Sequence, residues 1–339
     1  MSGHFRVRAP GRVNLIGDHT DYTGGLVMPM AIDRWTVIEG ARRAGQIELT
    51  SADEPDPVRL SLPIEDAASV EPSWGRYVAG VAAEMGPTAH AVEGRVTTDI
   101  PVGAGLSSSA ALELATALAL GFEGDPITLA ELGRRAEHRA SGVPCGIMDQ
   151  LSIAAGVAGH ALLIDCHALT VQPVPLADDI AVIVRFVQHR TLVGSEYADR
   201  VAECASAEAI IGPLRLATLD AVHTIEDGLI RRRARHVVTE NQRVQDFAGA
   251  LRRHDLAEVG RLMLASHDSL RDDFGVSTPV MDAAVADMAS RPGVYGARMT
   301  GGGFGGCIVA IADVGSADEA AGADGWVVHA VDGAIAGRS

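Results

Sequence analysis

Apolar and polar positions alternate along the first sixty residues, as they do in half-buried strands. The alternation is clear in Phe5-Arg6-Val7-Arg8-Ala9, and Pro10-Gly11 is expected to end that strand. Residues 26–37 are again apolar and β-branched, and residues 46–50 and 58–62 alternate with a period of two. The chain is therefore predicted to begin with β-structure.

Apolar runs with helical spacing dominate the next hundred residues. In chain order, the pattern predicts a helix at 74–85, a strand at 91–100, a buried helix at 106–120 and a helix at 148–155. Thr128 and Glu131 fit a capping box, which predicts a further helix that stops near Gly142. The chain thus changes from β-structure to helices before its midpoint.

The second half has its own alternation of strands and helices. The predicted elements are strands at 161–165 and 180–187, a chiefly helical segment at 197–288, and strands at 306–311 and 326–331. A stretch with Pro173, Pro175, Asp178 and Asp179 separates the first two of these strands. We place a domain boundary there, which gives an N-terminal domain at 1–175 and a C-terminal domain at 176–339.

Composition fits a globular protein of two domains that binds a small molecule. The 339 residues are 47% hydrophobic and 21% charged, and a chain of this length usually divides into two cores. A net charge of −16 disfavours nucleic acid and anionic membranes as partners. The chain has no Lys, so any phosphate must be held by Arg, backbone N–H groups, hydroxyls or a metal.

The four cysteines, at positions 145, 166, 204 and 307, are far apart and form no C-x-x-C pair. This disfavours a zinc site and a disulfide framework, and predicts reduced thiols. The N-terminus lacks the apolar core of a signal peptide, and no run is long enough to span a membrane. We therefore expect a cytoplasmic protein without a membrane partner.

A glycine- and serine-rich string joins the strand at 91–100 to the buried helix. It contains Gly103, Gly105, Ser107, Ser108 and Ser109. Glycines let the backbone approach a ligand, and the unpaired N–H groups of a helix start suit a phosphate. A plain turn with a serine cap explains the same string. It is not a Walker A loop, which needs Lys, and it contains no G-x-S-x-G hydrolase motif.

A second glycine cluster, residues 301–306, satisfies G-x-G-x-x-G. A strand-like run follows it, whereas a dinucleotide-binding fold requires a helix there, so we reject that interpretation. The cluster forms either a backbone wall against a ligand or a crowded turn.

Polar side chains crowd the loop after the first strand. They are Arg12, Asn14, Asp18, His19 and Asp21. Carboxylates beside imidazole and amide groups suit a ligand with many hydroxyls, because each hydroxyl both donates and accepts. Any single Asp or Asn here is equally compatible with a turn or a cap, and no His pair has the spacing of a metal site. Taken alone, Asp149 fits a helix cap and Glu137 a solvated helix face.

Together these strings resemble the motifs of the GHMP small-molecule kinases, and within them the galactokinases. The resemblance runs in family order through residues 11–22, 74–77, 103–111, 145–150, 194–197, 266–273 and 297–307. It implies an α+β fold of two domains, the first like ribosomal protein S5 domain 2 and the second a ferredoxin-like sandwich. It places the active site in the cleft between them.

The resemblance also implies an activity. It is the phosphorylation of a monosaccharide, D-galactose to galactose 1-phosphate, with ATP and Mg²⁺, by a monomer or weak homo-oligomer. Residues Gly103, Gly105, Ser107, Ser108 and Ser109 match positions that hold the ATP phosphates, Trp74 one that stacks on adenine, and Ser109 and Glu137 metal ligands.

The reacting end of the sugar has its own matched positions. Asp149 matches the base that takes the proton of the anomeric hydroxyl, and Arg12 a partner that keeps that carboxylate ionised and offsets charge on the phosphoryl group. The sugar-contacting positions are matched by Asp18, His19, Asp21, Gly146 and Tyr197. Among them, Asp21 is expected to face the axial 4-hydroxyl.

Two departures concern the substrate. Most family members have Glu at the position of Asp18, where the 6-hydroxyl is expected, and a polar run where this chain has Arg185-Phe186-Val187. A pentose, a uronic acid or a modified hexose is therefore an alternative substrate. A non-catalytic sensor of sugar and ATP is a third hypothesis, although the serine loop and Asp149 are intact.

Overall fold

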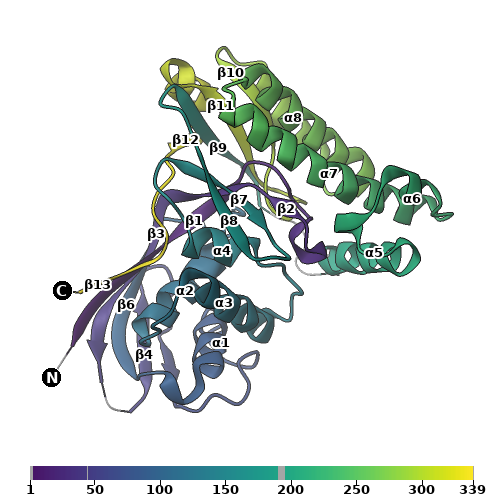
Figure 1. Cartoon of the computed structure of the whole chain (residues 1–339). Coiled ribbons are helices and arrows are strands. Elements are labelled where there is room, and N and C mark those ends of the chain that lie inside the picture. Colours follow the sequence, from purple (N-terminus) through teal and green to yellow (C-terminus); the bar gives the residue numbers. More distant parts are fainter. Residues whose placement is uncertain (1–2, 44, 190–194, 339) are drawn as a thin grey trace.

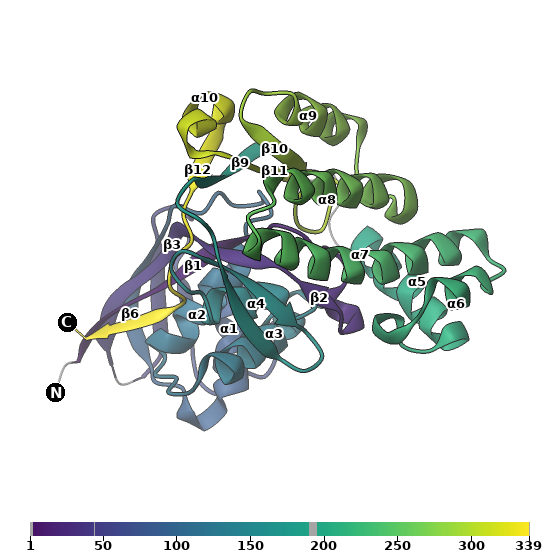
Figure 2. The ribbon, with the colours of Figure 1, turned by 45° about the horizontal axis from the view of Figure 1, so that its top comes forward.

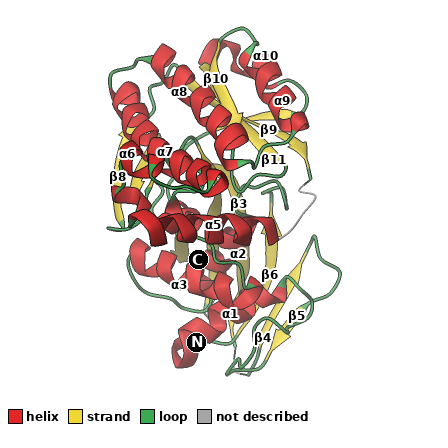
Figure 3. Cartoon of the chain, turned by 90° about the vertical axis from the view of Figure 1, so that its right-hand side faces the viewer, coloured by secondary structure: helices red, strands yellow, loops and turns green. Residues whose placement is uncertain are grey.

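A computed structural model describes residues 3–43, 45–189 and 195–338. Gly194, the first residue of one matched motif, lies outside these ranges. The described residues fold into two halves that stand one above the other in Figure 3, each with strands covered by helices. None of the described helices is both long enough and apolar enough to pass through a bilayer.

The N-terminal half is built on a six-stranded sheet in the order β13-β1-β3-β6-β4-β5. Its strands are β1 (His4–Asn14), β3 (Pro29–Arg42), β4 (Ile47–Ser51), β5 (Val58–Leu60), β6 (Val92–Thr98) and β13 (Ile335–Arg338). The last strand of the chain thus pairs with the first, and both termini lie at this edge in Figure 1. The division at residue 175 remains a prediction. It assigns β13 to the C-terminal domain, although β13 pairs with β1 in the sheet of the N-terminal half.

Helices cover one face of this sheet. They are α1 (Gly75–Met85), α2 (Ser108–Ala119), α3 (Pro126–Ser141) and α4 (Met148–Ala154). Short helical turns of this half are η1 (Asp21–Thr23) and η2 (Gly86–Thr88). Helix α2 is the buried element that its apolar sequence predicts, and Leu114, for example, is fully buried. Helix α2 packs against β1 and β3, and the N–H of Arg12 near the end of β1 donates to the carbonyl of Leu106 just before α2. The start of α2 therefore lies beside the end of β1.

The C-terminal half contains a four-stranded sheet in the order β10-β11-β9-β12. Its strands are β9 (Ile180–Gln188), β10 (Val294–Met299), β11 (Gly306–Asp313) and β12 (Gly325–Val328). Its helices are α5 (Ser195–Ile211), α6 (Leu219–His223), α7 (Gly228–Arg252), α8 (Leu256–Ser269), α9 (Pro279–Ala289) and α10 (Ala317–Ala321). Short helical turns are η3 (Leu214–Leu216), η4 (Leu270–Phe274) and η5 (Val314–Ser316). In Figure 2, α7 and α8 lie above the helices of the first half.

A three-stranded sheet in the order β2-β7-β8 contacts both halves, because β7 packs against β3 and both β2 and β8 pack against α7. It consists of β2 (Leu26–Val27), β7 (His160–Asp165) and β8 (Thr170–Pro175). Strand β8 was not predicted, because prolines at 173 and 175 suggest a break. They are tolerated here since β8 is an edge strand that pairs only with β7 among the described residues.

Two other local predictions are wrong. Pro10-Gly11 does not end the first strand: β1 continues to Asn14, and the pairing with β3 shifts register between Pro10 and Gly11. Helix α3 does not open at Thr128, because Asp125 is its N-cap and accepts hydrogen bonds from the N–H groups of Ile127 and Thr128. Pro126 then occupies the first turn, where its missing N–H costs nothing.

The core and several polar contacts join the two halves. Val244 and Phe247 of α7 belong to the same buried apolar cluster as Val13 and Leu15 near the end of β1. Thr300, after β10, donates to the Asn14 carbonyl at 2.9 Å. The loop after β1 is therefore held from both halves.

Candidate active site

A cavity of about 880 Å³ opens between the two halves; Asn14 of the polar loop is fully buried and does not line it, but all the residues matched to site positions of the family lie on its wall. These residues are Arg12, Asp18, His19, Asp21, Trp74, Gly103, Gly105, Ser107, Ser108, Ser109, Glu137, Gly146, Asp149 and Tyr197. They come from six separate stretches of the chain. The glycine turn at 301–303 completes the wall from the C-terminal half.

Arg12 and Asp149 form an ion pair at the cavity. Arg12 Nε and Nη2 lie 2.8 Å and 2.6 Å from Asp149 Oδ1, and Arg12 Nη1 donates to the Gly105 carbonyl at 2.6 Å. The guanidinium is buried, whereas the Asp149 side chain is 30% exposed toward the cavity. Asp149 does not cap its helix, because Ile147 is the N-cap residue of α4. Its carboxylate is thus oriented from behind and open in front.

Close packing at Gly11 brings this pair together. A Cβ atom at Gly11 would lie 2.9 Å from the Leu106 carbonyl oxygen, and the next residue, Arg12, donates its N–H to that same oxygen at 3.1 Å. Glycine is required at this position so that β1 can reach the serine loop.

Ser107 connects the serine loop to the ion pair. Its hydroxyl donates to Asp149 Oδ2 at 2.5 Å rather than capping α2, although it occupies the N-cap position. Its backbone is left-handed, with φ 61°, which is strained for a residue other than glycine. Gly103 and Gly105 are left-handed as well. The loop therefore turns its backbone and the start of α2 toward the cavity, where N–H groups favour an anion.

Ser109 and Glu137 lie side by side on α2 and α3. Ser109 Oγ is 3.2 Å from Glu137 Oε1, and burial together with the charge of Asp149 raises the pKa of Glu137. A bound cation would relieve that cost. A hydroxyl and one carboxylate suit Mg²⁺, which keeps most of its coordination for water and phosphate oxygens. The described residues contain no cluster of three or more acidic, His or Cys side chains that could hold a metal alone.

Gln150 supports Glu137 from behind. Its amide nitrogen lies 2.6 Å from Glu137 Oε2 and 3.1 Å from Glu113 Oε2. Glu113 is fully buried on α2, and its pKa is raised well above the usual value because of that burial and the nearby Glu137. Gln150 thus links the carboxylate at the cavity to a second carboxyl group in the core.

Asp21, His19, Gly146 and Tyr197 form a pocket beside Asp149. A Cβ atom at Gly146 would lie 2.0 Å from Asp21 Oδ2, so only glycine leaves room for this carboxylate. The His19 ring lies 5.6 Å from the Tyr197 ring, and the His19 backbone is left-handed with φ 63°. Burial and the charge of Asp149 raise the pKa of Asp21 to about 7. The pocket combines a carboxylate and an imidazole, as expected for a ligand with several hydroxyls.

Asp18 lies deeper in the wall. Its Oδ1 accepts from the Gly301 N–H at 3.0 Å, and its Oδ2 lies 2.6 Å from Arg298 Nη2. The side chain is only 2% exposed. Both oxygens are therefore engaged within the protein.

Trp74 lies at the far end of the cavity, at the N-cap position of α1. Its ring is mostly buried, and its Nε1 donates to the Asp56 carbonyl at 3.1 Å. The indole is thus fixed in one orientation. Arg185, one of the residues that depart from the family pattern, lies on β9 and pairs with Asp287 of α9 at 2.6 Å. It does not line this cavity.

Glu113, Gln150, Glu240 and Arg298 have no role that the sequence alone indicates. The first two occupy apolar surroundings near the serine loop, and Arg298 interrupts the apolar strand β10. A charged residue inside a buried strand must find a partner, and that was the available signal. Its partners could not be named, because they come from distant segments.

Three family models match separate parts of the chain. The galactokinase galactose-binding signature matches residues 2–42, the GHMP kinases N terminal domain residues 76–157, and the GHMP kinases C terminal domain residues 247–323. The first covers Arg12 and the polar loop, and the second covers the serine loop and Asp149.

Related proteins agree with these matches. The chain is 45% identical to the galactokinase of Bos taurus, over 92% of this chain and 84% of that protein. It is 43% identical to the galactokinase of Roseiflexus sp. (strain RS-1), over 91% and 84%.

Solved structures share the fold. Lactococcus lactis galactokinase complexed with galactose matches with a TM-score of 0.91 at 29% identity, over 98% of this chain and 95% of that one. Methanococcus jannaschii mevalonate kinase matches with a TM-score of 0.72 at 20% identity, over 97% and 99%, which is a likeness of fold alone. The chain belongs to the galactokinase family of the GHMP kinases.

Proposed function

We propose that this protein transfers the terminal phosphoryl group of ATP to the anomeric hydroxyl of D-galactose and releases ADP and galactose 1-phosphate. The observation that carries the proposal is the Asp149 carboxylate, which Arg12 and Ser107 fix on one side and which faces the cavity on the other. The family assignment supports the reaction class, and the pocket beside Asp149 supports a sugar as acceptor.

In this reaction the anomeric O–H gives its proton to Asp149 as the oxygen forms its bond to the terminal phosphorus. The bond from that phosphorus to the bridging oxygen of ADP breaks, and its electron pair leaves with ADP. Arg12 keeps one carboxylate oxygen oriented and places a positive charge near the transferring group. Because the chain has no Lys, Arg12 is the cation that its residues offer beside Asp149.

Backbone N–H groups at the start of α2 and the hydroxyls of Ser108 and Ser109 are proposed to bind the phosphates, and Trp74 to stack on adenine. Mg²⁺ is proposed to be held by Ser109 and Glu137. When bound, it would neutralise phosphate charge. We further propose that His19, Asp21 and Tyr197 bind the sugar and that the enzyme acts in the cytoplasm as a monomer or weak homo-oligomer.

The test is ADP release over a panel of sugars that includes galactose, glucose, a pentose and galacturonic acid. Galactose is expected to give the highest kcat/KM. Higher activity on another sugar would replace galactose as substrate, and binding of sugar and ATP without ADP release would indicate a sensor. In Glu137→Gln, the Mg²⁺ concentration needed for half-maximal rate is expected to rise about tenfold, whereas the galactose KM changes little.

A further inference from the structure

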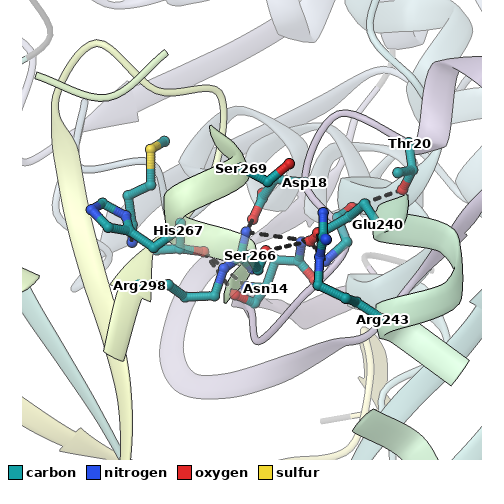
Figure 4. A network of polar contacts seen from close by, with 12 residues as sticks. Asn14, Asp18, Thr20, Glu240, Arg243, Ser266, His267, Ser269 and Arg298 are labelled. Carbon is teal, nitrogen blue, oxygen red and sulfur yellow. Dashed lines mark hydrogen bonds and ion pairs between the residues drawn. The ribbon is translucent and has the colours of Figure 1, made fainter. Parts of the chain in front are cut away.

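Behind the sugar pocket lies a set of three charged groups and one hydroxyl that the proposed reaction does not use. We call Asp18, Glu240, Ser266 and Arg298 the buried charge network (Figure 4). All four are buried. Charged groups are seldom placed so deep without a purpose that offsets the loss of water.

Arg298 is at the centre of this network. It comes from β10, its side chain is fully buried, and it does not line the cavity. Its Nη2 lies 2.6 Å from Asp18 Oδ2 and 3.9 Å from Glu240 Oε1. None of its three nitrogen atoms, Nε, Nη1 and Nη2, makes a well-aligned hydrogen bond within the part of the chain that the structure describes, so the contact with Asp18 is a close ion pair. Its charge is therefore balanced chiefly by these two carboxylates.

Asp18 connects that charge to two walls of the cavity. Its own backbone belongs to the sugar loop, defined as residues 17–21, which carries His19 and Asp21. Its Oδ1 accepts from the N–H of Gly301 in the glycine turn, which lines the cavity from the opposite half. The Asp18 carboxylate thus connects the sugar loop to the glycine turn through Oδ1, and Arg298 pairs with its other oxygen, Oδ2.

The sugar loop is anchored at two further points. Glu240 Oε1 accepts from the Gly17 N–H at 3.0 Å, and His236 Nε2 lies 3.1 Å from the Asp18 carbonyl oxygen. Glu240 is in turn held by Ser266 and by Arg243 Nε at 2.6 Å. Residue His19 sits between these anchors in a left-handed conformation. Such a conformation persists only where its surroundings impose it.

We propose that Arg298 is a positioning residue of the sugar site: it pairs with Asp18 and thereby fixes His19 and Asp21 against the glycine turn. In this arrangement the Asp18 carboxylate binds Arg298 and Gly301. It does not accept a hydrogen bond from the sugar's 6-hydroxyl. The inference rests on the proposed function, because it concerns how the same site binds its sugar.

Two sugars separate this role from direct contact. Galactose and 6-deoxygalactose differ only in the 6-hydroxyl, so a residue that binds this hydroxyl favours galactose, whereas a positioning residue affects both sugars alike. The kcat/KM ratio of the two sugars does not depend on how much of a preparation is folded. If 6-deoxygalactose is not phosphorylated, its inhibition constant against galactose replaces its KM.

The variants are Asp18→Asn, Arg298→Met and the two combined. Each single variant is expected to raise the KM of both sugars about tenfold, with kcat and the KM for ATP within about threefold and the ratio of the two sugars within about twofold. The double variant is expected to fall well short of the product of the two effects, because both substitutions break one pair. Arg291→Met, which removes an arginine 2.7 Å from Asp287 outside the network, is the matched control and leaves both KM values unchanged.

A loss of the preference for galactose in Asp18→Asn alone would overturn the inference and make Asp18 a ligand of the 6-hydroxyl. Unchanged KM values in folded Asp18→Asn and Arg298→Met would overturn it as well. If either fails to fold, Arg298→Lys keeps the charge and is expected to raise both KM values to a smaller extent, and no rise contradicts the proposal. A wild-type protein inactive on both sugars would instead refute the proposed function.

Discussion

Two Arg–Asp pairs with the same short separation serve this protein in different ways. Arg12 and Asp149 lie 2.6 Å apart at the cavity, as do Arg298 and Asp18 in the core. The Asp149 side chain is 30% exposed, whereas that of Asp18 is 2% exposed. A carboxylate open on one side can exchange a proton with a ligand, whereas one whose two oxygens both contact protein groups holds those groups in place. The exposure of the carboxylate, rather than its pairing with an arginine, therefore distinguishes a group that takes part in the reaction from one that positions other residues.

The largest expected effect breaks the exposed pair. Asp149→Asn is expected to lower kcat with galactose about 10³-fold, because the amide cannot take the proton of the sugar hydroxyl. Steady-state ADP release measures it. Asp33→Asn is the matched control, since Asp33 is 31% exposed and paired with His329 but lies outside the cavity. An unchanged rate in Asp149→Asn would remove this carboxylate from the mechanism.

The next effect concerns stability and distinguishes the two pairs. Asp18→Asn is expected to lower the free energy of unfolding by about 3 kcal/mol, because it removes a counter-charge of the fully buried Arg298. Asp149→Asn is expected to cost about 1 kcal/mol, since water from the cavity replaces part of the lost interaction. Urea denaturation of both variants provides the comparison. Equal losses would show that exposure does not govern these pairs.

The third prediction concerns the pH dependence of sugar binding at Asp21. The pKa of Asp21 is raised to about 7, so the carboxylate that should accept from the sugar is mostly protonated at pH 6. The galactose KM is expected to rise about tenfold between pH 8 and pH 6. Ionising Asp21 also costs stability, so the unfolding free energy of the unliganded protein should fall as pH rises from about 4 to about 7. Asp21→Asn should abolish the KM trend and lessen the fall in stability, the rest of which comes from other buried carboxyl groups with raised pKa values, such as Glu113 and Glu137. A KM titration that persists in this variant would assign it to another group.

The smallest effect concerns Ser107, whose backbone is strained and whose hydroxyl donates to Asp149 of the exposed pair. Ser107→Ala and Ser107→Gly both remove the hydrogen bond to Asp149, but only glycine adopts a φ of 61° without strain. The glycine variant is therefore expected to be about 1 kcal/mol more stable than the alanine variant. Thermal unfolding of the two proteins measures the difference, and a more stable alanine variant would argue against strain at this residue.

Much of the site could be predicted because its residues lie in compact strings. The polar loop, the serine loop and the segment before Asp149 each indicate a ligand site, and residues of all three line one cavity. The errors arose where local signals compete. Pro10-Gly11 marks a bulge within β1 rather than an end, and the prolines of β8 sit on a sheet edge. Neither outcome can be read from neighbours in the sequence, because it depends on which strand pairs alongside.

The α+β character, the family motifs and most residues that face the cavity can be predicted from the chain, since periodicity and glycine placement are local properties. The contacts of Asp18 with Arg298 and Gly301 depend instead on how distant segments pack, because these residues are more than 270 positions away in the chain. The link that Gln150 makes between Glu113 and Glu137 depends on such packing as well. The cost of burying a charge depends on the groups around it in space, and chain order does not specify those groups.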